Sequence, residues 1–352
     1  MKKLFYLLAI YTITSLLLVS CNNNKPKNII LLIGDGMSTP QVCAAMLTQD
    51  SPIVFEQFSY SGLVKTTSNS HKITDSAAGG TAIATGHKTN NGMIGMNSSS
   101  IPAESILETL SDKGMKTGLI ATSYITHATP ASFVAKNINR NNYEEIASDF
   151  ANCEKVDLLI GGGRNHFNKR SDGLDLIEKM KSDGWNYYDT LINIDTKAEK
   201  ILILADENHL PSYPQRGNFL SDATSIALKN LENKNGFFLM IEGSQIDFAC
   251  HNNDSIYLVN EMLDFCNTIN VALDYAKENQ NTLVIVTADH ETGGLSIIDP
   301  DGRYTKTEFR FSTGSHSPLL VPIFAYGPGA NQFTGIMENT DIVKRIIQKT
   351  GN

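Results

Sequence analysis

The segment Asn-Ile-Ile-Leu-Leu-Ile-Gly-Asp-Gly-Met, residues 28–37, joins an unbroken apolar run to two glycines that flank a carboxylate. Such a run is typical of a strand that is buried on both faces of a parallel sheet. Similar runs recur at 117–121, 156–160, 201–204, 237–241, 282–287 and 321–326. Segments with helical periodicity lie between them, at 102–113, 143–150, 174–183, 221–231 and 256–277. This alternation predicts an α/β fold, a three-layer sandwich with a mostly parallel central sheet.

The composition limits the classes of partner. The chain has 352 residues, and its 29 Lys and Arg against 37 Asp and Glu give a formal net charge of −8. This length is ample for a large core, and the acidic balance argues against nucleic acid as a partner. No repeat or linker interrupts residues 28–352, which therefore predict a single domain.

The amino end reads as a targeting segment. Two lysines precede a mostly apolar run, 4–19, which ends in Leu18-Val19-Ser20-Cys21. This pattern predicts a secretory signal, residues 1–21, and its last four residues resemble a bacterial lipobox, in which the cysteine becomes the lipidated amino terminus. A plain signal peptide is the alternative. With 22–27 as a polar tether, we expect an exported protein that is anchored to a membrane through a lipid on Cys21 and faces the periplasm or cell exterior.

Four further cysteines would then lie where disulfides can form: Cys43, Cys153, Cys250 and Cys266. The sequence identifies no pair among them, and it contains no C-x-x-C metal motif. Cys250 stands beside His251, but its position on a predicted helix favours a small buried residue over a metal ligand.

Acidic residues follow several of the predicted strands. Asp35 follows the first run, Glu242 follows 237–241, and Asp289 and His290 follow 282–287. The carboxyl ends of parallel strands form the functional edge of a sheet, and carboxylates that converge there would repel one another. Asp, Glu and His are ligands for divalent ions, so the pattern predicts a metal site at this edge.

Two shorter patterns agree with a metal-dependent reaction on phosphate. Asp247 and His251 are spaced i, i+4, so a helix would place them on one face at a spacing that suits zinc; a solvated helix face is the alternative. Ser76 begins a small-residue helix, where a serine is ordinarily an N-cap. Such a helix start also suits a phosphate. No Ser-His-Asp order is apparent, so a metal would have to generate the alkoxide.

The chain after Lys27 resembles the alkaline phosphatase family. Six motifs stand in the family's order: Gly34-Asp35-Gly36-Met37, Thr74-Asp75-Ser76-Ala77-Ala78, His127-Ala128-Thr129-Pro130-Ala131, Glu242-Gly243-Ser244-Gln245-Ile246-Asp247, Thr287-Ala288-Asp289-His290, and the His316 segment before Val321-Pro322. The resemblance implies zinc-dependent hydrolysis of phosphate monoesters, with release of inorganic phosphate and Ser76 as the nucleophile that forms a phosphoserine.

The resemblance also implies three metal sites and a phosphate-binding residue, Arg140. The sites are one zinc held by Asp247, His251 and His316, a second zinc held by Asp35, Asp289 and His290, and a magnesium held by Asp35, Thr129 and Glu242. Members of the family are often dimeric, so a homodimer is a further expectation.

Two positions depart from the family pattern. His127 stands where some members carry Asp, which makes it a candidate ligand of the third ion and leaves magnesium open there. Phe248 stands where others place Lys, His or Trp. Because phenylalanine cannot hold phosphate by charge, we expect phosphate binding to rest more heavily on Arg140.

Other readings of the sequence remain open. A phosphodiesterase or sulfatase of the same superfamily would share two metals, although no C/S-x-P-x-R motif surrounds Ser76. A metal- or phosphate-binding surface lipoprotein would need no nucleophile. Four histidines lack a partner at ligand spacing and are predicted to lie on the surface or to support the site: His71, His87, His166 and His209. The glycine-rich segment 161–164 lacks the P-loop pattern and is read as a turn.

Overall fold

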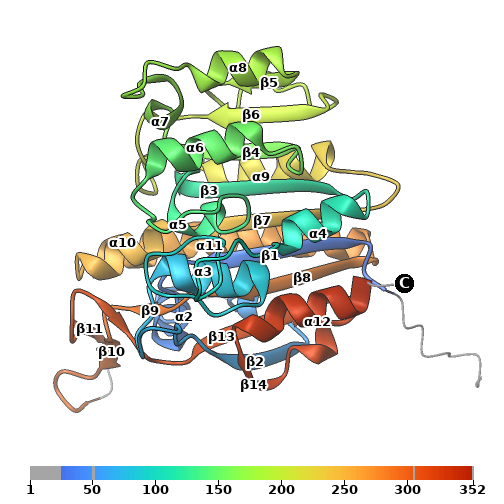
Figure 1. Cartoon of the computed structure of the whole chain (residues 1–352). Helices are drawn as coiled ribbons and strands as arrows, with labels where there is room; N and C mark the ends of the chain where they lie inside the picture. The colour runs from blue at the N-terminus through green and yellow to red at the C-terminus, as the bar shows by residue number, and fades with distance from the viewer. Residues whose placement is uncertain (1–24, 50–51, 304–305, 351–352) are drawn as a thin grey trace, which may run out of the picture.

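The structure is a computed structural model that describes residues 25–49, 52–303 and 306–350 (Figure 1). Its centre is a ten-stranded sheet. The strands are β1 Asn28–Gly34, β2 Tyr60–Lys65, β3 Lys116–Tyr124, β4 Leu158–Gly162, β5 Trp185–Tyr188, β6 Lys200–Leu204, β7 Phe237–Gly243, β8 Thr282–Thr287, β13 Val321–Tyr326 and β14 Gly335–Glu338. They stand in the order β14-β2-β13-β8-β1-β7-β3-β4-β6-β5. The pairings are parallel except those of β13, which runs antiparallel to β2 and β8.

Helices cover both faces of this sheet. They are α2 Thr39–Met46, α3 Ser76–Thr85, α4 Ile106–Asp112, α5 Ala128–Ala131, α6 Tyr143–Asn152, α7 Asn165–Asn168, α8 Leu176–Ser182, α9 Phe219–Asn230, α10 Gln245–His251, α11 Ser255–Glu278 and α12 Thr340–Thr350. In Figure 1, α3, α4 and α12 lie in front of the sheet, and α9 and α11 lie behind it. The predicted three-layer α/β fold with a mostly parallel sheet is confirmed.

The seven predicted strands all belong to the sheet, with shifted bounds at some ends. The run 156–160 becomes β4 from Leu158 onward; just before it, the carboxylate of Asp157 accepts from the backbone N–H of Thr117 at 2.8 Å. Three strands of this sheet were not predicted: β2, β5 and β14. They lie toward the margins of the sheet and are partly exposed, so their residues form no continuous apolar run.

Helix bounds also differ from the predicted ones in places. The helical pattern at 102–113 becomes α4 only from Ile106, since Ser105 caps the helix and Glu108 completes a capping box. The long pattern at 256–277 is α11, one residue longer at each end. Within the part of the chain that the structure describes, no helix is long and apolar enough to cross a membrane.

The register of the three central strands places their carboxyl ends side by side. Ile33 of β1 lies opposite Glu242 of β7 and Thr287 of β8. The residues that follow Ile33 and Thr287, including Asp35 and Asp289, therefore emerge at the same edge as Glu242. The prediction that the acidic residues after these strands meet at one edge of the sheet is confirmed.

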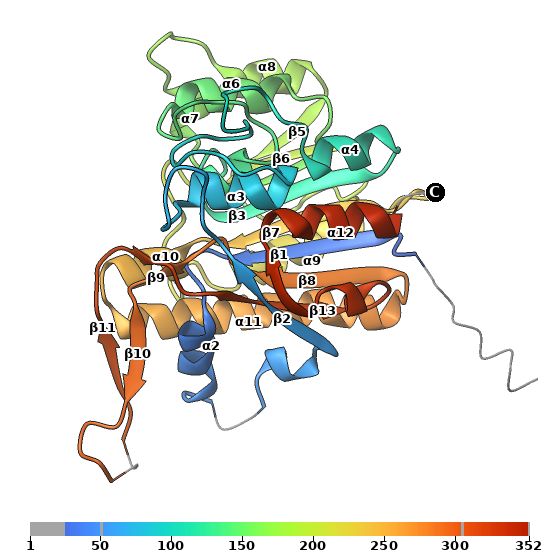
Figure 2. The same ribbon diagram turned by 60° about the horizontal axis from the view of Figure 1, so that its bottom comes forward.

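His316 reaches this edge by a long excursion of the chain. A hairpin of β10 (Leu295–Ile298) and β11 (Glu308–Phe311) projects from the body of the molecule (Figure 2). The chain then returns through β12 (His316–Ser317), which pairs antiparallel with β9 (Glu291–Thr292). The register sets His316 opposite Thr292, two residues after His290.

The four cysteines after the predicted signal, Cys43, Cys153, Cys250 and Cys266, are free thiols in the structure. Cys250 is buried, as its place on the helix predicted. The predicted signal segment, 1–21, and residues 22–24 of the predicted tether lie outside the described residues.

Candidate active site and metal centre

The candidate site lies at the carboxyl ends of β1, β7 and β8, between α3 and α10. Asp35 follows β1 directly and is fully buried. The next residue, Gly36, has a φ of +74°, and a Cβ there would lie 3.0 Å from the Cα of Asp247. A glycine is therefore needed for the turn after β1 to approach α10 closely.

A first group combines two histidines with Asp247. The Nδ1 atoms of His251 and His316 each lie 2.8 Å from a backbone carbonyl oxygen, that of Gly314 and that of Thr74 respectively. A carbonyl can only accept, so each Nδ1 carries the proton and each Nε2 is left with its lone pair. The two Nε2 atoms lie 3.2 Å apart, and Asp247 Oδ2 is 3.4 Å from that of His251. Such a cluster of electron pairs suits a cation.

The pKa values of His251 and His316 indicate which imidazole would bind a proton if no metal ion were bound. The hydrogen bond with Asp247 raises the pKa of His251 to about 9, whereas burial lowers that of His316 to about 4. One imidazole therefore takes up a proton at neutral pH, in the place where a metal ion would neutralise the same lone pairs. The ligand atoms of the three residues lie within 4.8 Å of one another.

A second group is buried deeper, around His290. Its Nε2 lies 3.1 Å from Asp289 Oδ2 and 3.4 Å from Asp35 Oδ1. Both carboxylate oxygens of Asp35 and Oδ2 of Asp289 are buried without a hydrogen-bond donor. Burial raises the pKa of Asp35, and the charges of Asp289 and Asp247 raise it further. Buried carboxylates without donors fit a divalent ion that would replace their lost hydration.

A third group brings His127 to Asp35 and Glu242, with ligand atoms within 4.8 Å. Glu242 Oε1, Thr129 Oγ1 and His127 Nδ1 are buried and lack hydrogen-bond partners. Burial raises the pKa of Glu242 to about 7. His127 Nε2 lies 3.3 Å from Nη2 of Arg140, which can only donate. This contact and metal ligation through Nδ1 require opposite tautomers of His127.

Ser76 is the first residue of α3 and is 2% exposed. It is not the N-cap that a serine at a helix start would ordinarily be, because Asp75 fills that position and accepts from Ala78 N at 3.0 Å. The Ser76 hydroxyl is therefore free to face the site, where its Oγ lies 3.1 Å from His290 Nε2.

Arg140 reaches the same place from the loop before α6. Its Nη1 donates to Asp75 Oδ2 at 3.1 Å, and Gly92 N donates to the same oxygen at 3.0 Å. Asp75 thus holds both the helix start that presents Ser76 and the guanidinium beside it. Asp75 belongs to the motif around Ser76, but the motif does not predict its contact with Arg140; its adjacency to Ser76 is the signal that the sequence offers.

Other supporting contacts carried no signal in the sequence. Thr292 donates its hydroxyl to Asp247 Oδ1. The carbonyl groups that orient His251 and His316 belong to Gly314 and Thr74, and backbone atoms leave no trace in residue identity.

The remaining singled-out histidines divide into two pairs. His71 and His87 are exposed, as predicted. His209 stacks on Tyr124, with ring centroids 3.5 Å apart, and His166 stacks on Tyr143 at 4.7 Å.

Phe248 faces this aromatic group and brings no charge to the site. Its ring packs edge-on against His127 and His209, with centroids 5.9 and 5.0 Å away. The turn predicted at 161–164 is wrong for its first half, because Gly161 and Gly162 end β4; a Cβ on Gly162 would lie 2.1 Å from the carbonyl oxygen of Asn208.

Comparison with known proteins agrees with this geometry. A sequence model of the alkaline phosphatase family matches residues 26–305. Alkaline phosphatase 3 of Bacillus subtilis is 32% identical, over 93% of this chain and 89% of the relative. The alkaline phosphatase of the Antarctic bacterium TAB5 superposes with a TM-score of 0.90 at 42% identity, over 93% of this chain and 98% of that one. One structure of it is a mutant in which a histidine is replaced by aspartate, with Mg bound in the M3 site.

A cold-active alkaline phosphatase from Shewanella superposes with a TM-score of 0.85 at 30% identity, over 92% of this chain and all of that one. Buried carboxylates and imidazoles meet at the carboxyl ends of the central strands, beside a serine and an arginine. The chain belongs to the alkaline phosphatase family and is an enzyme of that family.

Proposed function

We propose that this phosphatase hydrolyses phosphate monoesters through a phosphoserine on Ser76, with two zinc ions at the first and second groups. The observation that carries the proposal is the position of Ser76 Oγ, 3.1 Å from His290 Nε2 at the edge of a cluster of donor-free carboxylates. Zinc would supply a Lewis acid that lowers the pKa of the serine hydroxyl and stabilises the leaving oxygen.

The contacts of His290 favour a metal ligand over a conventional relay. In a Ser-His-Asp triad the serine and the aspartate use opposite nitrogens of the ring. Here Ser76, Asp289 and Asp35 all face Nε2, while Nδ1 lies 3.2 Å from the hydroxyl of Thr292. One nitrogen that faces several oxygens suits an ion shared among them.

The protein's own residues then account for the course of the reaction. Ser76 Oγ forms the new bond to phosphorus as the alcohol oxygen of the substrate leaves, and water later displaces Ser76 to release inorganic phosphate. Arg140 offers a planar fork to two non-bridging oxygens, and Asp75 keeps that fork in place. The start of α3 adds backbone N–H groups and the positive end of its dipole.

The third group is proposed to hold magnesium through Asp35, Thr129 and Glu242, with His127 at its border. We expect His127→Asp to increase retention of magnesium, because hard cations prefer oxygen ligands and the carboxylate replaces an imidazole. Elemental analysis after dialysis against mixed zinc and magnesium measures this, and His87→Asp adds the same charge at an exposed position. An unchanged metal ratio in His127→Asp would show that His127 does not border the ion.

We propose further that the protein is exported and lipid-anchored through Cys21, as the lipobox pattern predicts. The enzyme would then act on small phosphate monoesters in the periplasm or at the cell exterior. A homodimer, which the family resemblance implied, remains a prediction of the same kind.

The decisive experiment compares p-nitrophenyl phosphate with its bis-ester. Ser76→Ala should abolish monoester turnover and covalent labelling by radioactive phosphate, while elemental analysis finds the metals unchanged. Ser98→Ala, an exposed serine on the loop after α3, is the matched control. Labelled phosphate on Ser76→Ala would refute the nucleophile. Faster hydrolysis of the bis-ester by the unmodified enzyme would favour a phosphodiesterase, and turnover of neither ester would favour a binding lipoprotein.

A further inference from the structure

The surface charge of this acidic protein is distributed unevenly. A groove of about 640 Å³ carries five lysines and a single carboxylate, although the whole chain has a net charge of −8. We refer to it as the lysine groove; it is lined by Lys27, Lys116, Thr196, Lys197, Lys229, Asn230, Glu232, Asn233 and Lys234.

The lysine groove lies at the pole opposite the metal site. Lys27 immediately precedes β1, Lys116 begins β3, and Lys234 lies three residues before the start of β7. These are the amino ends of strands whose carboxyl ends carry Asp35 and Glu242. Figure 1 shows β1 starting at the right, whereas α10 and β9 lie at the left. A seven-residue strand spans roughly 20 Å, so the two poles are separated by about that distance.

Stabilisation of the end of α9 explains only two of the five lysines in the groove. Lys229 lies in the last turn of α9, and Lys116 Nζ donates to the carbonyl oxygen of Asn230 at 3.4 Å, so both complement the end of that helix. Lys27, Lys197 and Lys234 lie outside helices and are exposed. Among the residues that the structure describes, these three form no ion pair.

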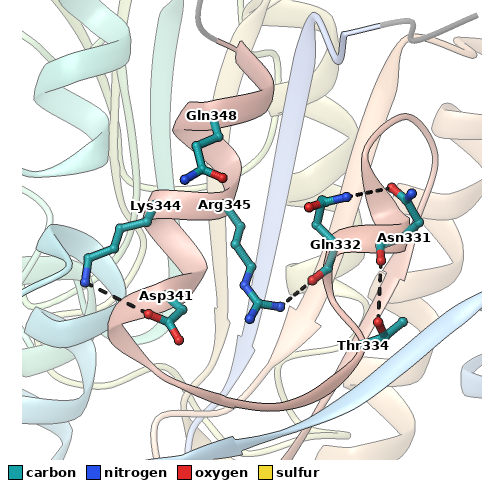
Figure 3. A pocket seen from close by; sticks show the side chains of 7 residues that line it. All are labelled: Asn331, Gln332, Thr334, Asp341, Lys344, Arg345 and Gln348. Carbon is teal, nitrogen blue, oxygen red and sulfur yellow. Dashed lines mark hydrogen bonds and ion pairs between the residues drawn. The ribbon is translucent and has the colours of Figure 1, made fainter.

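A second polar groove lies between α12 and the turn at 331–334 (Figure 3). Unlike the three exposed lysines of the lysine groove, its two cations are paired within the protein. Lys344 there lies 4.0 Å from a carboxylate oxygen of Asp341, and Arg345 donates to the carbonyl oxygen of Gln332.

The position of the lysine groove along the chain links it to the membrane. Five residues lie between the lipobox Cys21 and Lys27, and a fully extended chain covers at most about 3.6 Å per residue step. A lipid on Cys21 would therefore keep the groove within about 20 Å of the headgroups. Electrostatic attraction at physiological salt acts over about 8 Å, so rotation of the tethered protein brings the lysines into range.

We propose that the lysine groove is a docking surface for the headgroups of anionic phospholipids, which orients the anchored enzyme with its metal site away from the membrane. The inference rests on the proposed lipidation of Cys21 and is independent of the phosphatase chemistry. Juxtamembrane lysines bind anionic lipid surfaces by charge, and the groove collects several of them at one pole. Docking there would leave the opposite pole open to soluble substrates.

Lysine reactivity in vesicles tests the proposal on the full, lipidated protein. Mass spectrometry of the Cys21 peptide first establishes the acyl chains. The protein is then bound to vesicles of phosphatidylcholine, with or without phosphatidylglycerol, and acylated with an amine-reactive ester. We expect labelling of Lys27, Lys197 and Lys234 to fall by about threefold or more with phosphatidylglycerol, and to recover in about 0.5 M salt, which shortens the Debye length.

Two lysines outside the groove provide an internal control for labelling. A double variant within the groove tests whether its charge causes the protection. Lys72 and Lys306 are exposed outside the groove and should label equally in both kinds of vesicle. The double variant Lys197→Gln/Lys234→Gln should weaken the protection of Lys27, whereas Lys72→Gln/Lys306→Gln should preserve it.

Several results would overturn the docking surface. They are the absence of acyl chains on Cys21, equal labelling with and without phosphatidylglycerol, and protection that salt does not reverse. Turnover of p-nitrophenyl phosphate is measured on the same vesicles. Unprotected lysines in an active enzyme would refute the docking surface alone, and protected lysines in an inactive one would refute the proposed reaction alone.

Discussion

The carboxylate of Asp75 contacts three parts of the site at once. One oxygen caps α3 through Ala78 N, and the other accepts from Gly92 N and from Arg140. Ser76 and Arg140, the proposed nucleophile and the proposed phosphate-binding residue, are thus positioned by a single side chain. Phe248, by contrast, contributes an uncharged ring next to His127, so Arg140 has no neighbouring cation from that side.

Arg140→Ala is therefore expected to lower monoester kcat/KM. Charge-assisted bonds are worth about 1.5 to 3 kcal/mol each, which corresponds to roughly 10-fold to 160-fold per lost bond. Diester hydrolysis should fall much less, because a diester carries a substituent where one of the charged oxygens would sit. Steady-state assay of both esters measures the difference, with Arg310→Ala as an exposed control. Equal losses for both substrates would mean that Arg140 only maintains the structure.

The environment of His166 predicts how the stability of the fold depends on pH. Its ring is stacked on Tyr143 and contacts the hydroxyl of Thr126, and burial lowers its pKa below the ordinary 6.5, outweighing the opposite effect of Glu144. The unfolded chain then binds the proton more readily than the folded one. His166 therefore contributes stability that is present above about pH 6.5 and is lost as the pH falls toward its folded pKa.

The pH dependence of the melting temperature tests this contribution. His166→Gln removes the titrating group, so its melting temperature should fall less steeply between pH 7.5 and 5 than that of the unmodified protein. His87→Gln changes an exposed side chain and serves as the control. An identical pH dependence in His166→Gln and the unmodified protein would contradict the assignment.

Among the larger elements, the loop between β6 and α9 is held to the sheet's rear helix by a buried ion cluster. Arg216 on this loop donates to Glu261 at 2.8 Å and to Asp264 at 2.7 Å, both on α11. The side chains of all three are at most 2% exposed. The same loop carries His209, which stacks on Tyr124 beside the metal site.

Arg216→Ala should destabilise the fold strongly, because it leaves two carboxylates buried without their cation. Breaking such a pair costs about 3 to 5 kcal/mol. Urea unfolding measures the loss. Arg310→Ala, which breaks the exposed pair with Glu308, should cost about 1 kcal/mol or less. A comparable small effect for Arg216→Ala would show that water or a neighbouring group compensates the buried charges.

At the scale of the whole molecule, the metal ligands join segments from both ends of the chain. Asp35 follows the first strand and His316 belongs to β12, yet the two residues belong to candidate ligand groups that share Asp247. Metal ions that bind only the folded state would tie these distant segments together and would stabilise the protein by mass action.

Removal of the metals should therefore abolish activity and lower the melting temperature by about 5 °C or more. Dialysis against a strong chelator, followed by calorimetry and the monoester assay, measures both effects. Zinc should restore them, and magnesium alone should not. Full activity in protein shown to be metal-free by elemental analysis would contradict a metal-dependent reaction.

Local sequence patterns determined the central strands of this protein and the positions of several residues of the candidate site. The apolar runs at β1, β7 and β8 had to be buried strands, and Asp35, Glu242 and Asp289 had to emerge at one edge because parallel strands share their direction. The motif around Ser76 likewise pointed to phosphate chemistry before any contact was known.

Tertiary structure alone decided the rest. The strands β2, β5 and β14 exist because neighbouring strands offer hydrogen bonds at the margins of the sheet, not because their own residues form an apolar run. The opposed lone pairs of His251 and His316 depend on backbone carbonyls from distant loops, and the two contacts of Asp75 depend on where Gly92 and Arg140 come to lie. Periodicity and propensity report a residue's near neighbours in the chain, whereas these partners are brought together only when the whole chain packs.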